Sequence, residues 1–95
     1  MTQATLLIVE DDGVLALFLT ETVIALGYRV LGPVASGEQA IKLLQDHRPD
    51  LVLMDIGLAG ELNGIQTAEI ITRSADLPIV FLTGYSQESL LEQAK

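Results

Sequence analysis

Three short apolar runs in this chain each end at acids or at a hydroxyl group. Apolar runs of this length are typical of strands that are buried on both faces of a parallel sheet. If the three strands are parallel neighbours, their polar ends meet at one edge of the sheet, where open α/β sheets bind ligands. The runs are residues 6–9, 51–54 and 78–82, and the polar residues that follow them are Glu10, Asp11, Asp12, Asp55 and Thr83.

Segments with a helical pattern separate the strand-like runs. Strands that alternate with helices of this length pair in parallel through right-handed crossovers. Pro33 follows the second expected strand and favours an edge position for it, while Asp12 and Ser36 stand where helix N-caps are expected. We therefore expect one α/β domain over residues 1–95, with a doubly wound parallel sheet in the order 2-1-3-4. The expected strands are residues 5–9, 28–32, 51–54 and 79–82, and the expected helices are residues 13–26, 37–47, 64–73 and 86–95.

Composition narrows the possible functions of these 95 residues. The chain has no cysteine, which excludes a disulfide framework and a thiolate metal site. Its formal net charge of −8 argues against direct binding of nucleic acid, which needs a basic surface. The chain has neither a signal-peptide pattern at its start nor an apolar run of about 18 residues that would span a membrane. We therefore expect a cytoplasmic domain with no membrane contact.

The acids at the strand ends predict a site for a hard cation. Glu10 and Asp11 end the first expected strand, beside the strand end that carries Asp55. Crowded carboxylates repel one another unless a cation lies between them, and oxygen donors without nearby histidine or cysteine favour Mg²⁺, Mn²⁺ or Ca²⁺. Asp12 has a simpler explanation as a helix N-cap. The single histidine, His47, falls at the end of a helix far from this edge, and we assign it no catalytic role.

Asp55 has the position expected of a nucleophile. A carboxylate beside a cation can attack phosphorus in line and form an acyl phosphate. Such a transfer needs mainly positioning and charge neutralisation, which a cation and a hydroxyl donor supply. Gly57 could offer its backbone carbonyl to the metal, and Thr83 could donate a hydrogen bond to a phosphoryl oxygen. The simpler alternatives are a turn acid at Asp55 and an ordinary threonine at a strand end.

Four motifs together resemble the receiver domain of bacterial two-component response regulators: LLIVEDD, PDLVLMDIGL, NGI and PIVFLTGY. The resemblance covers essentially the whole chain and implies a flavodoxin-like fold. It implies that Glu10 and Asp11, with Asp55 and the Gly57 carbonyl, hold Mg²⁺ or Mn²⁺. Asp55 would take phosphate from a phosphohistidine on a sensor histidine kinase or a histidine phosphotransfer protein. Thr83 would be the switch hydroxyl that moves toward the phosphate.

The chain departs from the family at its C-terminal end. Receivers have a fifth strand that ends in a lysine, then a last helix, and this sequence stops before both. We therefore expect an incomplete receiver domain that lacks the fifth β/α unit, which puts efficient phosphorylation in question. The missing unit would leave the fourth strand at an edge and would expose apolar side chains of the first helix. Because such surfaces promote association, we expect a homodimer or strand exchange in this form.

Two other functional classes stay open. One is a receiver-like interaction module that is never phosphorylated, which the missing lysine keeps possible. The other is a Mg²⁺-dependent phosphatase with an aspartyl nucleophile, but such enzymes usually carry a second acid two residues after the nucleophile, where this chain has Gly57. We therefore expect a phosphoryl-accepting signalling domain in a phosphorelay, which switches partner interactions and is not an enzyme that turns over substrate.

Overall fold

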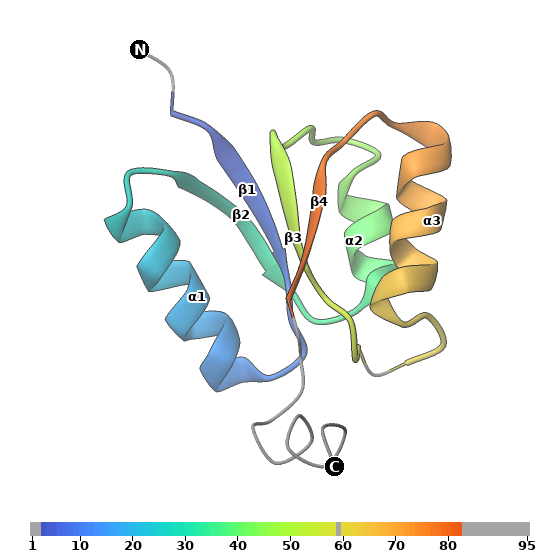
Figure 1. Cartoon of the computed structure of the whole chain (residues 1–95), viewed down its shortest axis with the longest axis horizontal. Helices are drawn as coiled ribbons and strands as arrows, with labels where there is room; N and C mark the ends of the chain where they lie inside the picture. Colours follow the sequence, from blue (N-terminus) through green and yellow to red (C-terminus); the bar gives the residue numbers. More distant parts are fainter. Residues whose placement is uncertain (1–2, 59, 83–95) are drawn as a thin grey trace, which may run out of the picture.

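The computed structural model describes residues 3–58 and 60–82, which form four strands and three helices. The sheet is parallel throughout, in the order β2-β1-β3-β4 (Figure 1). The predicted fold class and strand order are therefore confirmed. The elements are β1 (Thr5–Val9), α1 (Gly13–Ala25), β2 (Arg29–Val34), α2 (Gly37–Leu43), β3 (Leu51–Asp55), α3 (Gly64–Ser74) and β4 (Ile79–Leu82).

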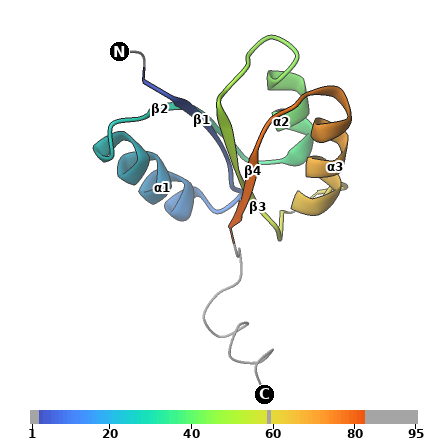
Figure 2. The ribbon, with the colours of Figure 1, turned by 45° about the horizontal axis from the view of Figure 1, so that its top comes forward.

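The helices cover opposite faces of the sheet. Figure 1 and Figure 2 show α1 on one face, with α2 and α3 on the other. Because side chains alternate along a strand, β1 supplies both halves of the core. Leu6 and Ile8 pack in the cluster that contains Val23 of α1, whereas Leu7 and Val9 belong to the cluster on the side of α2 and α3. The central strands thus have almost no exposed side-chain surface, as their apolar sequence predicts.

Side-chain caps define where each helix begins. The carboxylate of Asp12 accepts hydrogen bonds from the amides of Val14 and Leu15, which confirms its predicted capping role. Ser36 caps α2 in the same way, and Asn63 forms a reciprocal capping box at the start of α3. These caps fix the points at which the chain turns from a strand end into the next helix.

Two predicted boundaries were wrong. β2 does not end at Gly32 but continues through Pro33 to Val34, with an irregular register opposite β1. It lies at the edge of the sheet, where a proline without an N–H is tolerated. The helix predicted to reach His47 ends at Leu43, because the chain then tightens into turns. The helix predicted over residues 86–95 lies outside the described residues.

No helix among the described residues has the length and apolar character needed to cross a membrane.

The start of α3 packs closely against the end of β3 at Gly64. The Gly64 amide donates to the carbonyl of Ile56, and a Cβ atom at Gly64 would collide with the backbone of Asp55 and Ile56. Since backbone atoms cannot move aside as a side chain can, this position requires glycine, and α3 starts directly against the end of β3.

We expect the substitution Gly64→Ala to lower the free energy of unfolding by about 1–3 kcal/mol, because the new methyl group forces the start of α3 away from Asp55. The measurement is urea unfolding followed by circular dichroism. Gly13→Ala is the matched control, since a Cβ atom there would meet nothing within 4 Å. We expect that variant to unfold within about 0.5 kcal/mol of the unsubstituted protein. Equal stability of the two variants would contradict the close packing at Gly64.

Candidate functional site

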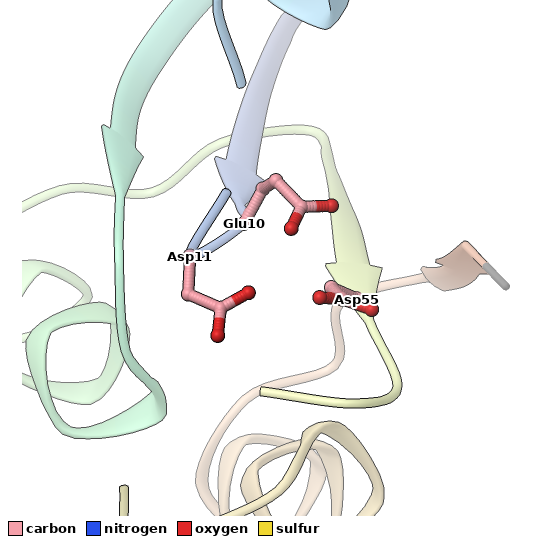
Figure 3. Close-up of side chains that lie close together, drawn as sticks. All are labelled: Glu10, Asp11 and Asp55. Atoms are coloured by element: carbon pink, nitrogen blue, oxygen red, sulfur yellow. The ribbon is translucent and has the colours of Figure 1, made fainter. Parts of the chain in front are cut away.

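Three carboxylates meet at the carboxyl edge of the sheet. Val9 of β1 pairs with Met54 of β3, so the residues that follow them, Glu10 and Asp55, lie at the same level on neighbouring strands. Asp11 comes next along the chain, and Figure 3 shows all three carboxylates grouped together. One carboxylate oxygen from each residue lies within 4.8 Å of the others. Parallel pairing of β1 with β3 is therefore what assembles this cluster.

The three acids differ in their surroundings. Glu10 and Asp55 are only 3% and 2% exposed, whereas Asp11 faces solvent. Oε2 of Glu10 accepts a hydrogen bond from the Asp12 amide at 3.1 Å, and Oδ1 of Asp55 accepts one from the Gly57 amide at 3.1 Å. Oε1 of Glu10 is buried and has no hydrogen-bond partner among residues 3–58 and 60–82. A buried acceptor without a partner lowers the stability of the fold unless a cation or a proton binds to it.

Burial and crowding change the ionisation of Glu10. The pKa of Glu10 is raised from 4.5 to about 7, mainly because burial penalises the charged carboxylate. The amide of Asp12 opposes this rise, while hydrogen bonding and charge repulsion from Asp55 add to the pKa, as does a hydrogen bond to Asp11. Near neutral pH the cluster therefore binds a proton readily, and a cation in the same place would compete with that proton.

The donor set fits a hard divalent cation. All three side chains offer carboxylate oxygens, the ligands that Mg²⁺ and Mn²⁺ prefer, and the buried Oε1 of Glu10 supplies an unsatisfied acceptor. Of the predicted site residues, the structure brings Glu10, Asp11 and Asp55 together. Gly57 lies beside them, because its amide donates a hydrogen bond to Oδ1 of Asp55. Thr83 lies outside the described residues.

The described part of the surface has three grooves, one of which includes acids of this cluster. One of about 320 Å³ includes Glu10 and Asp11 and runs between α1 and the end of β2. A second, of about 420 Å³, lies between α2 and α3, and a third, of about 580 Å³, lies along β2 and α2. Neither of the larger grooves contains an acid of the cluster, so their volume does not identify the functional site. The chemistry of the carboxylates does.

Sequence reasoning missed two residues that support the site. Gly64 lets α3 start against the backbone of Asp55, although the sequence marked it only as part of the NGI motif. Glu38 accepts a hydrogen bond from the Leu62 amide, and the sequence indicated only a place in the first turn of a helix. The spacing of residues 36–39 could predict the cap, but no local pattern could predict a contact between residues that are 24 positions apart.

Comparisons with known proteins agree with this geometry. Residues 6–95 match the family model of the response regulator receiver domain. The chain is 37% identical over 89 residues to the transcriptional regulatory protein PdtaR of Mycobacterium tuberculosis, in a match that covers 94% of this chain but 43% of PdtaR. The chain thus spans less than half the length of this curated relative.

Solved structures give the same result. The signal receiver domain of a modulated diguanylate cyclase from Desulfovibrio desulfuricans has a TM-score of 0.81 and 37% identity, over 96% of this chain and 74% of that one. PhyR of Bartonella quintana, crystallised with the anti-sigma factor NepR, has a TM-score of 0.76 and 25% identity, over 97% of this chain and 47% of that one. The chain belongs to the receiver domain family of two-component response regulators.

Proposed function

We propose that Asp55 is the phosphoacceptor of this receiver domain and that Mg²⁺ or Mn²⁺ binds beside it, held by Glu10, Asp11 and Asp55. The observation that carries the proposal is a cluster of three carboxylates, each with one oxygen within 4.8 Å of the others. One buried oxygen of this cluster, Oε1 of Glu10, has no hydrogen-bond partner in the described part of the chain. The phosphate donor would be a phosphohistidine on a sensor histidine kinase or a histidine phosphotransfer protein. The phosphorylated domain would then change its interactions with partner proteins.

Two features of Asp55 support its proposed role as the nucleophile. It ends the buried strand β3, and the Gly57 amide binds one of its carboxylate oxygens, which fixes the orientation of the group. The second oxygen can then attack phosphorus in line as the bond from phosphorus to the imidazole nitrogen breaks. A bound cation would neutralise the charge that the donor phosphate brings to three carboxylates. Phosphate transfer then leaves an acyl phosphate on Asp55.

Two further roles rest on the family pattern. We propose that Gly57 offers its backbone carbonyl to the metal and that Thr83 donates its hydroxyl to a phosphoryl oxygen. The amide contact between Gly57 and Asp55 supports the first role, because it keeps this part of the chain close to the carboxylate cluster. Thr83 lies outside the described residues, so its role rests on the family pattern alone.

Acceptance of phosphate without continued turnover is the function that we favour over a phosphatase. A phosphatase of this kind would need a second acid two residues after the nucleophile, and this chain has Gly57 there. An unphosphorylated interaction module would not require the costly burial of Glu10 beside Asp55. Direct binding of nucleic acid by this domain is not proposed, given its net charge of −8.

We expect the substitution Asp55→Asn to abolish formation of the acyl phosphate, because the amide cannot act as the nucleophile. The experiment incubates the protein with Mg²⁺ and a small phosphate donor, then measures by mass spectrometry the addition of one phosphoryl group. Asp76→Asn is the matched control, since Asp76 is exposed and lies before β4, at the opposite edge of the sheet. Labelling of the Asp55→Asn variant would assign the phosphate to another residue, and no label on either protein would favour an interaction module.

We expect the stability of the protein without divalent cations to fall as the pH rises from 4.5 to about 7. The pKa of Glu10 is higher in the folded state than its ordinary value of 4.5, so the contribution of the protonated form is fully present below pH 4.5 and is lost as the pH passes about 7. The loss should be on the order of 3–4 kcal/mol, at about 1.4 kcal/mol for each pKa unit over a rise from 4.5 to about 7.

Urea unfolding at several pH values measures this loss. The control is Glu10→Gln, which cannot ionise and should therefore have a flatter profile over the same range. Addition of Mg²⁺ at pH 8 should restore stability to the unsubstituted protein and much less to the variant. Identical profiles for the two proteins would show that Glu10 titrates normally.

We also propose that this form of the chain associates with a second copy, as a dimer or by strand exchange. The outer side of α1 exposes Val14, Leu17 and Phe18, and β4 is an edge strand of the sheet that the described residues form. Light scattering over a range of concentrations should reveal a dimer, and Phe18→Ser should weaken it. Ile65→Ser is the control, because Ile65 is exposed on α3 instead. A monomer at every concentration would contradict the proposal.

A further inference from the structure

The described part of the loop between β3 and α3, residues 56–58 and 60–63, begins directly after the proposed phosphoacceptor. Three contacts fix its two ends. The Gly57 amide donates to Asp55, the side chain of Leu58 is buried in the core on the side of α2 and α3, and the Gly64 amide donates to the carbonyl of Ile56. The ends of the loop are therefore held by the sheet, by the core and by the start of α3.

Glu38 of α2 holds the outer part of this loop. Oε1 of Glu38 accepts a hydrogen bond from the Leu62 amide at 3.0 Å. Its other oxygen, Oε2, lies next to Gly60. A Cβ atom built on Gly60 would be 3.4 Å from this oxygen. Gly60 has a φ of 103°, a conformation that side chains disfavour, so the loop turns sharply toward Glu38 at a glycine. Both carboxylate oxygens of Glu38 thus face the loop.

This contact joins two elements that are distant in sequence. Glu38 lies in the first turn of α2, whose cap is Ser36, and Leu62 lies just before Asn63, the cap of α3. The hydrogen bond therefore ties the start of α2 to the approach of the chain into α3. Since the acceptor is ionised, the bond is stronger than one between neutral groups. Glu38 is exposed, so it adds little to the core. Its charge favours the first turn of α2, and its side-chain contacts are with the loop.

We propose that Glu38 is a positioning residue for the cation: it fixes the loop from which the Gly57 carbonyl would face the metal. This inference rests on the proposed function. Residues that orient the ligands of a metal, without binding it themselves, typically change metal affinity by about 10- to 100-fold when they are replaced. Glu38 acts through an exposed hydrogen bond and through several residues of chain. We therefore expect a smaller effect, about 3- to 10-fold, for its removal.

Charge offers a competing explanation, because a carboxylate at residue 38 also attracts a cation at long range. The variants Glu38→Ala and Glu38→Gln separate the two explanations. Glutamine keeps an oxygen that can accept from the Leu62 amide but has no charge, whereas alanine lacks both. If the hydrogen bond is what matters, glutamine restores affinity; if the charge matters, the two variants bind Mg²⁺ equally weakly.

The experiment is a calorimetric titration of Mg²⁺ into the unsubstituted protein and three variants at pH 8, where Glu10 is ionised. We expect Kd to rise by about 3- to 10-fold for Glu38→Ala and by less than about 2-fold for Glu38→Gln. The third variant, Glu61→Ala, removes a charge from an exposed residue of the same loop whose side chain makes no hydrogen bond to any other described residue. We expect its Kd to stay within about 2-fold of the unsubstituted protein.

A second measurement does not involve the metal. Amide hydrogen exchange without Mg²⁺ should be faster at Leu62 in Glu38→Ala than in the unsubstituted protein, and Glu38→Gln should recover most of the protection. Thermal unfolding should change little in any of the variants, because residue 38 is exposed.

The outcomes separate this inference from the proposed function. If the unsubstituted protein binds no Mg²⁺, the proposed function fails and this inference fails with it. If it binds Mg²⁺ and Glu38→Ala binds equally well, or if Glu38→Gln is as weak as Glu38→Ala, only the positioning role of Glu38 is wrong. Unchanged exchange at Leu62 in Glu38→Ala would also overturn it, since the loop would then be held by other contacts.

Discussion

The parallel pairing of β1 with β3 forces three carboxylates into one small space. Because Val9 pairs with Met54, Glu10 and Asp55 lie side by side at the ends of the two strands. Two carboxylates that were free in water would move apart, since their charges repel each other. Burial of Glu10 then raises its pKa to about 7 and leaves one of its oxygens without a hydrogen-bond partner among the residues that the structure describes. Burial of apolar side chains on both faces of the sheet stabilises the strands that carry the acids, and this offsets the cost of crowding the carboxylates. The stability of the sheet thus keeps together three carboxylates that repel one another.

The chain around this edge is held by backbone contacts, which leave little freedom for the site to relax. Gly64 brings the start of α3 against the backbone of Asp55, and its amide closes the loop at Ile56. The amides of Asp12 and Gly57 each bind one of the buried carboxylates. Because each of these two hydrogen bonds comes from a backbone amide close to its carboxylate in sequence, the orientation of both carboxylates is restricted.

Much of this structure could be predicted from the sequence, because the informative signals are local. Apolar runs identified the strands, Pro33 placed β2 at the edge, and order along the chain then put Glu10, Asp11 and Asp55 at one edge. The end of α2 was predicted at His47 but lies at Leu43, because no residue type near Leu43 marks the change from helix to turns. The burial of Glu10 and the contact from Glu38 to Leu62 depend on residues far apart in sequence, which local patterns do not reveal.

A proton and a divalent cation compete for the same oxygens, and this competition links chemistry to folding. At neutral pH the raised pKa of Glu10 means that the cluster can reduce its repulsion by binding a proton. A cation would remove more charge repulsion than one proton does, without placing a proton on the oxygens of the cluster, and the proposed nucleophile needs a free oxygen. Metal binding would therefore stabilise the sheet edge and prepare Asp55 in the same event. If the proposed cation binds here, the electrostatic strain at the strand ends is what would make the domain respond to it.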